Sequence, residues 1–136
     1  MSERQIYDRP LSERPRLVKL GIRRGQRISL VGIDPPGFAE ELEDAGADVS
    51  RRLRPDTDLI FFAAQTEADL RRLAELRRYI KSKGGIWVLR RKGRDATIKE
   101  GRLIEAGLAA HMVDNKVVAF DERLSAMRMV IRLVDR

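Results

Sequence analysis

The side chains best suited to binding in this chain are cationic, and they follow short apolar runs that have the character of β-strands. Arginine binds carboxylates and phosphates bidentately, and lysine binds them as a point charge. Parallel strands of an open α/β sheet end at one edge, outside which ligands bind. The candidate ligand-binding residues at this predicted edge are Gly32, Asp34, Arg51, Arg52, Arg90, Arg91 and Lys92. We therefore predict an anion-attracting edge, with a solvated rim of paired charges as the alternative.

The loop after the first predicted strand matches a cofactor-binding loop only in part. Such loops rely on small residues and free backbone N–H groups that approach the cofactor closely. Gly32 and Gly37 are present, but Pro35 and Pro36 between them carry no N–H and stiffen the chain. We interpret the segment as a rigid turn from strand to helix, with no evident cofactor motif.

Residue types that serve in catalysis are scarce. The chain has no cysteine, which excludes thiolate nucleophiles, disulfides and Cys-ligated zinc. The single histidine, His111, has no evident partner, and Ser125 is not part of a nucleophile elbow. The acids Asp34, Asp114 and Asp121 show no spacing that indicates a pair or a metal site. We predict no catalytic residue and no metal ligand, which leaves enzymatic activity undecided and favours a binding role.

The length of 136 residues predicts one domain with a core that needs no disulfides. Residues 1–14 are polar and are predicted to be an extended or disordered arm, followed by a single domain over 15–136. The arm lacks the apolar stretch of a secretory signal, and no apolar run approaches the roughly 20 residues that span a bilayer. We expect a cytoplasmic protein without a membrane partner.

The charge balance favours an anionic partner. The chain has 28 Lys and Arg against 21 Asp and Glu, a formal charge of +7. An anionic small molecule and nucleic acid both suit this charge. Nucleic acid is not favoured, because acids alternate with the basic residues and few aromatic side chains are available for base stacking.

A βαβ unit at the centre of the chain organises the predicted fold. Residues 59–64 are a continuous apolar run, typical of a parallel strand that is covered on both faces. Thr66 and Asp69 have the spacing of a capping box, apolar residues recur with helical spacing as far as Ile80, and the basic last turn of the predicted helix ends at Lys81. Gly84 and Gly85 are predicted to stop this helix in the left-handed conformation, and residues 86–89 restart a strand.

The flanking segments extend this unit into a three-layer α/β open sheet. Before it we predict a short helix that begins at Pro15, a strand over 27–33, a helix from Phe38 and a half-exposed edge strand over 47–53. After it, Thr97 and Glu100 repeat the capping-box spacing at the start of a helix. Strands over 113–120 and 126–134 are too close in sequence for a crossover, so they are predicted to form an antiparallel hairpin.

This order of elements resembles the Rossmann-like fold of class I S-adenosylmethionine-dependent methyltransferases over about residues 15–134. KSKGGIWVL resembles the turn before the fifth strand of that fold, and EAGL resembles the turn into the sixth. The segments PLSERPRLVKLGIRRG, GIWV and VDNKVVAFDERLSAMRMVIRL are also similar to a small bacterial family of unknown function. Members of that family usually have Trp-Pro-Lys after the fifth strand, whereas Trp87 is followed here by Val88.

The resemblance implies S-adenosylmethionine as the one candidate cofactor, but two of its motifs are missing. The second strand should end in an acid that binds ribose hydroxyls, and Arg51 and Arg52 stand there instead. A catalytic motif expected after the fourth strand is replaced by residues 63–66, AAQT. We predict a methyltransferase-like domain that acts as a non-catalytic binding or accessory module for an anionic ligand. The alternatives are a divergent methyltransferase and a basic nucleic-acid-binding protein, and we consider a homodimer through the second strand or the hairpin.

Overall fold

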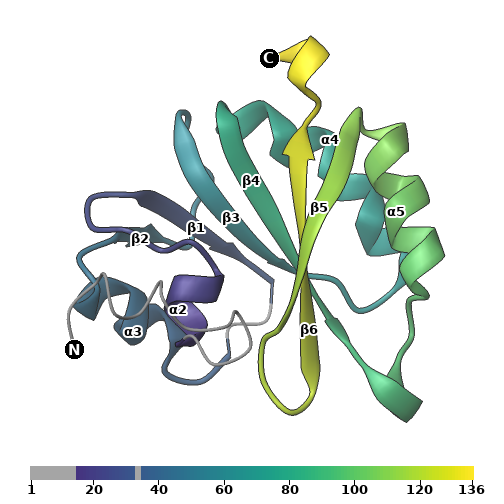
Figure 1. Cartoon of the computed structure of the whole chain (residues 1–136), viewed down its shortest axis with the longest axis horizontal. Coiled ribbons are helices and arrows are strands. Elements are labelled where there is room, and N and C mark those ends of the chain that lie inside the picture. Colours follow the sequence, from purple (N-terminus) through teal and green to yellow (C-terminus); the bar gives the residue numbers. More distant parts are fainter. Residues whose placement is uncertain (1–14, 33–34) are drawn as a thin grey trace.

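Six strands form one open sheet in the part of the chain that the structure describes, residues 15–32 and 35–136 of a computed structural model (Figure 1). The predicted arm over 1–14 and the candidate residue Asp34 lie outside these residues. The strands lie in the order β2-β1-β3-β4-β6-β5. Their bounds are β1 (Arg27–Val31), β2 (Asp48–Ser50), β3 (Thr57–Ala63), β4 (Ile80–Arg91), β5 (Met112–Ala119) and β6 (Leu124–Ile131).

The predicted parallel sheet with a C-terminal antiparallel hairpin is confirmed. β1 pairs in parallel with β2 and β3, and β3 pairs in parallel with β4. β6 is antiparallel to both of its neighbours, β4 and β5. The hairpin therefore folds back so that its second strand fills the place next to β4. As a result, β5 runs in the same direction as β4 at the edge of the sheet.

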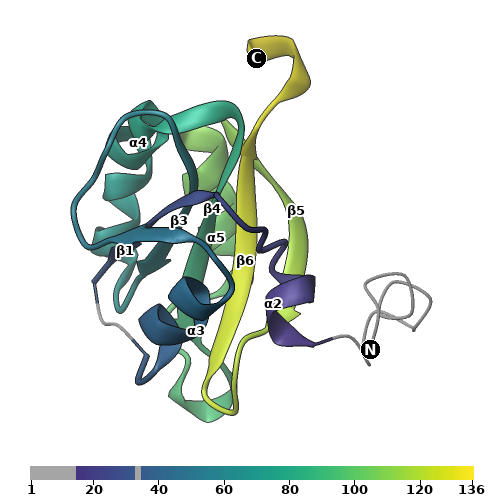
Figure 2. The ribbon, with the colours of Figure 1, turned by 90° about the vertical axis from the view of Figure 1, so that its left-hand side faces the viewer.

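Helical segments cover both faces of the sheet and complete the predicted three layers (Figure 2). α2 (Arg16–Lys19) and α3 (Phe38–Asp44) lie on one face, and α5 (Glu100–Ala109) lies on the other with the segment that joins β3 to β4. Short 3-10 helices η4 (Gly93–Asp95) and η5 (Leu133–Asp135) follow β4 and β6. No helix within the described residues is long and apolar enough to cross a membrane.

The side chains of β4 alternate between the two faces of the sheet, so this one strand contributes to the hydrophobic core on each face. Ile86 and Val88 are fully buried against the layer of α5, and Trp87 and Leu89 are buried against the layer of α2 and α3. Side chains of successive strand residues point to opposite faces, so a strand between two helical layers needs apolar residues at every position. The continuous apolar runs of the sequence are explained by this arrangement.

The predicted helix over 66–81 is wrong in type and in length. Three short segments take its place: η2 (Glu67–Arg72), α4 (Leu73–Leu76) and η3 (Arg77–Tyr79). The capping box at its start is confirmed, because the Thr66 hydroxyl accepts from the Asp69 N–H and the Asp69 carboxylate accepts from the Thr66 N–H. The segment ends at Tyr79, and β4 already begins at Ile80.

Gly84 and Gly85 lie inside β4 and do not stop a helix in the left-handed conformation. A Cβ atom on Gly84 would lie 2.8 Å from the Asp58 carbonyl oxygen, and one on Gly85 would lie 2.8 Å from Arg128 Nε. The register of β3 and β4 shifts at this point, where Thr57 pairs with Ile80 but Leu59 pairs with Gly85. The glycines therefore permit close packing beside a bulge.

Other predicted boundaries also change. α5 begins at Glu100 without a side-chain cap, because the Thr97 hydroxyl donates to the Gln65 carbonyl oxygen and not to the helix. Pro15 is the N-cap of α2 and not its first residue. The strands predicted over 47–53 and 126–134 are shorter, and the second ends at Ile131 before η5.

Replacing Asp69 with asparagine is expected to lower the thermal midpoint at neutral pH. The N–H groups of Gln65 and Thr66 donate to Asp69 Oδ2 at 2.8 and 3.0 Å and hold the pKa of this carboxyl below its ordinary value of 3.8. Because the folded-state pKa is the lower one, the stabilisation is complete above a pH of about 3.8 and is lost as the pH falls through the folded-state pKa.

Thermal unfolding followed by circular dichroism at several pH values tests this. The difference in thermal midpoint between Asp69→Asn and the unchanged protein should become smaller in acid. A difference that stays constant with pH would contradict the stabilising role of the ionised Asp69 carboxylate. Glu43→Gln on the exposed side of α3 is the control, because the Glu43 carboxylate has no hydrogen bond or ion pair within residues 15–32 and 35–136.

Candidate functional site

A cavity of about 380 Å³ opens at the carboxyl edge of the parallel strands. Four parts of the chain meet there: the loop after β1, the end of β3, the end of β4 and the turn between β5 and β6. The residues that line it are Pro35, Pro36, Ala63, Ala64, Gln65, Leu89, Arg91, Asp121, Arg123 and Leu124. The cavity therefore lies at the edge where the sequence places a ligand.

The alternation of β4 decides which of its basic residues faces this cavity. Arg91 lines it together with Leu89, two residues earlier on the same face. Arg90 lies on the opposite face, where its Nη1 donates to the Ile98 carbonyl oxygen at 3.0 Å. Lys92 borders a second cavity, of about 260 Å³, that is also lined by Arg91. The run Arg90-Arg91-Lys92 is thus divided between two faces of the sheet.

The turn between β5 and β6 brings a further cation, Arg123, to the same place. Asp121 Oδ1 accepts from the N–H groups of Arg123 and Leu124 at 2.8 and 2.7 Å, which closes the turn. The Lys92 N–H donates to the Arg123 carbonyl oxygen at 3.0 Å, which holds the turn against the end of β4. Arg91 and Arg123 consequently line both cavities.

The guanidinium groups of Arg91 and Arg123 are not neutralised by the part of the chain that the structure describes. Neither forms a hydrogen bond or an ion pair with a side chain of residues 15–32 or 35–136. Asp121 is near, but its carboxylate is engaged by the turn. Asp95 and Glu122 line only the smaller cavity. Two exposed cations therefore flank an opening whose floor is largely apolar.

Other predicted site residues lie elsewhere on this edge. Gly32 has a φ of 93°, and a Cβ atom on it would lie 3.0 Å from the Ala63 carbonyl oxygen. It lines a separate cavity of about 330 Å³ between the end of β3 and η2. Arg51 and Arg52 follow β2 and line neither cavity that contains Arg91. The structure does not gather the predicted residues into one cluster, and their binding role stays a prediction.

The remaining candidates for chemistry lie apart from the cavity. His111 is exposed in a left-handed turn with a φ of 60°, directly before β5. Because β5 runs parallel to β4, its first residue lies at the amino edge of the sheet, opposite the cavity. Within residues 15–32 and 35–136, no group of three or more histidines and acids could hold a metal ion.

Comparison with solved structures decides the fold. A TehB-like SAM-dependent methyltransferase from Corynebacterium glutamicum aligns with a TM-score of 0.65 and 14% identity, covering 95% of this chain and 94% of that chain. The fold is that of the class I S-adenosylmethionine-dependent methyltransferases. The predicted methyltransferase-like core is therefore confirmed, and the resemblance to a bacterial family of unknown function stays a prediction.

Two further structures support the same fold. A SAM-dependent methyltransferase from Aquifex aeolicus aligns with a TM-score of 0.59 and 16% identity, covering 96% of this chain and all of that chain. A magnesium protoporphyrin IX methyltransferase from Synechocystis, solved with bound SAH, aligns with a TM-score of 0.63 and 11% identity over 85% of this chain and 78% of that chain. No family model matches the chain. No curated protein matches it.

The described residues do not fit S-adenosylmethionine at the two places where the fold leads us to expect contacts. Pro35 and Pro36 after β1 offer no backbone N–H to a ligand. Arg51 and Arg52 after β2 are donors and cannot accept hydrogen bonds from ribose hydroxyls.

Proposed function

We propose that this domain binds a small anionic ligand at the carboxyl edge of its sheet and acts as a binding or accessory module. The observation that carries the proposal is the pair Arg91 and Arg123, whose guanidinium groups flank one cavity without a described carboxylate partner. A guanidinium binds a carboxylate or phosphate through two parallel hydrogen bonds, which is stronger than a contact between neutral groups. Two such groups on one opening favour an anion over a neutral or cationic ligand.

The cavity also supports binding more than catalysis. Among the residues that the structure describes, its lining offers no histidine, serine, lysine or tyrosine. The one carboxylate in the described part of the lining is that of Asp121, whose Oδ1 accepts two backbone hydrogen bonds that close the turn. The other lining residues are alanine, leucine, proline, arginine and Gln65. Two arginines beside a mainly apolar described lining are suited to holding an anion.

Titration with inorganic phosphate, followed by amide chemical shifts in NMR, tests the proposal. The largest shifts are expected near Arg91, Arg123 and Ala64. Arg91→Gln and Arg123→Gln are each expected to weaken phosphate binding about tenfold, since each loses one charge-assisted contact. Arg78→Gln, on the exposed surface of η3, is the matched control and should leave binding unchanged.

Equal weakening in all three variants would mean that only net charge matters, and it would overturn the site. Unchanged binding in both Arg91→Gln and Arg123→Gln would do the same. Circular dichroism of each variant checks that the fold is kept. We expect it to be kept, because Arg91 and Arg123 are exposed and their side chains form no contact with the described residues that folding requires.

A second candidate function, a divergent S-adenosylmethionine-dependent methyltransferase, is favoured by the fold. One structure with this fold was solved with bound SAH, and Gly32 after β1 is a small residue of the kind that lets the backbone approach a cofactor closely. Calorimetric titration with S-adenosylmethionine separates the two candidates. We expect no heat of binding at micromolar concentration, and a micromolar Kd would replace the first proposal with the second.

A further inference from the structure

We infer that the ligand is an amphipathic anion, in which one carboxylate or phosphate group is joined to a compact apolar body. This inference rests on the proposed function, because it assigns the anionic group to Arg91 and Arg123. It goes further by using the rest of the cavity. The two arginines separate a larger, mainly apolar cavity from a smaller, charged one.

The larger cavity has the size and lining of a site for an organic molecule. Its volume of about 380 Å³ lies at the lower end of the range for small-molecule sites, roughly 300–1,000 Å³. Ala63, Ala64, Leu89 and Leu124 supply aliphatic walls, and Pro35 and Pro36 line the loop side. An inorganic anion beside the arginines would leave these walls in contact with water, whereas an apolar body would cover them.

The backbone around the floor has little hydrogen-bonding capacity left for a polar body such as a sugar. The Ala64 N–H donates to the Leu89 carbonyl oxygen at 2.9 Å. The Gln65 N–H donates to Asp69 at 2.8 Å, and the Gln65 carbonyl oxygen accepts from the Thr97 hydroxyl. Hydroxyl groups buried against this floor would lose water without replacement, which is unfavourable. The apolar interpretation therefore follows from occupied polar groups as well as from the apolar walls.

The smaller cavity limits the charge of the ligand. Lys92 adds a third cation there, but Asp95 and Glu122 lie on the same walls. A single carboxylate or phosphate between Arg91 and Arg123 would not contact those acids. A long polyanion that extends into the smaller cavity would meet both carboxylates, and like charges in contact are destabilising. A single anionic group on an apolar body suits both cavities.

A matched series of ligands tests this class. Acetate carries the anion alone, 2-naphthol carries the apolar body alone, and 2-naphthoate carries both, with 2-naphthyl phosphate distinguishing phosphate from carboxylate. We expect 2-naphthoate to bind about a hundredfold more tightly than acetate, because burial of an aromatic body adds affinity. It should bind about tenfold more tightly than 2-naphthol, through the arginines.

Two variants keep the two parts of the inference separate. Leu124→Asn places an amide in the aliphatic wall and should weaken 2-naphthoate about tenfold without changing acetate, whereas Arg91→Gln should weaken both. Leu133→Asn, on the exposed η5, is the matched control. If 2-naphthoate binds no better than acetate, the amphipathic class is wrong while the anion site stands. If 2-naphthol equals 2-naphthoate, or neither anion binds, the anion site itself is wrong.

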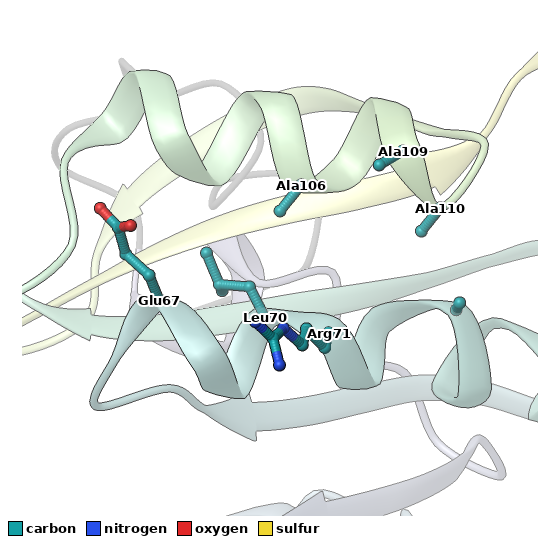
Figure 3. A pocket seen from close by; sticks show the side chains of 7 residues that line it. Glu67, Leu70, Arg71, Ala106, Ala109 and Ala110 are labelled. Atoms are coloured by element: carbon teal, nitrogen blue, oxygen red, sulfur yellow. The ribbon is translucent and has the colours of Figure 1, made fainter.

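A second apolar hollow, of about 340 Å³, does not compete with the carboxyl edge. It lies between η2, α4 and α5 and is lined by Leu70 and small residues, with Glu67 and Arg71 at its rim (Figure 3). Glu67 Oε1 lies 3.9 Å from Arg102 Nε, so the carboxylate at this rim has a cationic partner. The described lining contains one arginine, Arg71, whereas two arginines flank the cavity at the carboxyl edge. We therefore expect 2-naphthoate to leave the amide signals of Ala106 and Ala109 unchanged.

Discussion

Trp87→Ala is expected to lower the free energy of unfolding by about 3–5 kcal/mol, the usual cost of removing a fully buried aromatic side chain. Trp87 is 0% exposed in the middle of β4. Its ring stacks against Phe61 on β3, with centroids 6.4 Å apart and an angle of 9° between the planes. Its Nε1 donates to the Leu20 carbonyl oxygen at 3.2 Å, which ties the end of α2 to the sheet. Alanine would leave a cavity and an unpaired carbonyl in the same place.

Trp87→Phe separates these two effects. Phenylalanine fills most of the space but cannot donate to Leu20, so its expected cost is about 1–2 kcal/mol. Urea unfolding should be followed by far-UV circular dichroism, because Trp87 is the only tryptophan and its fluorescence is lost in both variants. A loss below about 1 kcal/mol for Trp87→Ala would contradict full burial.

The sheet and its hairpin were predictable because their signals are local. The apolar run before Ala64 indicated a doubly covered strand, and it is buried on both faces in β3. Met127 and Met129 alternate with charged Arg128 in the sequence, and both methionines are buried in one core. Alternation with a period of two depends on the strand alone, so no distant contact was needed to infer it.

The segment after β3 was mispredicted because one pattern suits two helical forms. Leu70, Leu73 and Leu76 are all buried, as the apolar periodicity indicated. Their spacing of three, however, fits the three residues per turn of a 3-10 helix as well as it fits an α-helix. The structure uses 3-10 turns on both sides of α4. The sequence thus indicated the buried face correctly and left the hydrogen-bonding pattern open.

The sequence located the candidate site at the carboxyl edge of the sheet, but it did not indicate which residues meet there. The period of two in β4 implies that Arg90 and Arg91 point to opposite faces, although their adjacency in the sequence suggests a single cluster. No pattern in the sequence indicated that Arg123 lines the cavity. It reaches the cavity because β6 pairs antiparallel with β4 and places Leu124 opposite Arg91. That register is a contact between distant segments, and no local pattern specifies it.

Gly84→Ala is expected to lower the free energy of unfolding by about 1–3 kcal/mol, in the range for overpacked sites. The new Cβ atom would lie 2.8 Å from the Asp58 carbonyl oxygen and 3.1 Å from that of Lys81. Asp58 has little freedom to move, because its Oδ2 accepts from the Arg27 N–H at 2.8 Å and its Oδ1 lies 3.1 Å from Lys81 Nζ. Backbone of β3 would therefore have to shift.

Two companion variants decide between close packing and a left-handed helix stop. A left-handed stop accepts asparagine nearly as well as glycine, so Gly84→Asn would be mild under that alternative. Close packing against Asp58 makes Gly84→Asn at least as costly as Gly84→Ala. Gly101→Ala is the matched control, because its new Cβ atom would meet nothing within 4 Å on α5. Alanine there should stabilise by about 0.5–1 kcal/mol. In urea unfolding, a loss for Gly84→Asn at least as large as for Gly84→Ala would place Gly84 in the strand, and a clearly smaller loss for Gly84→Asn would return it to a left-handed turn.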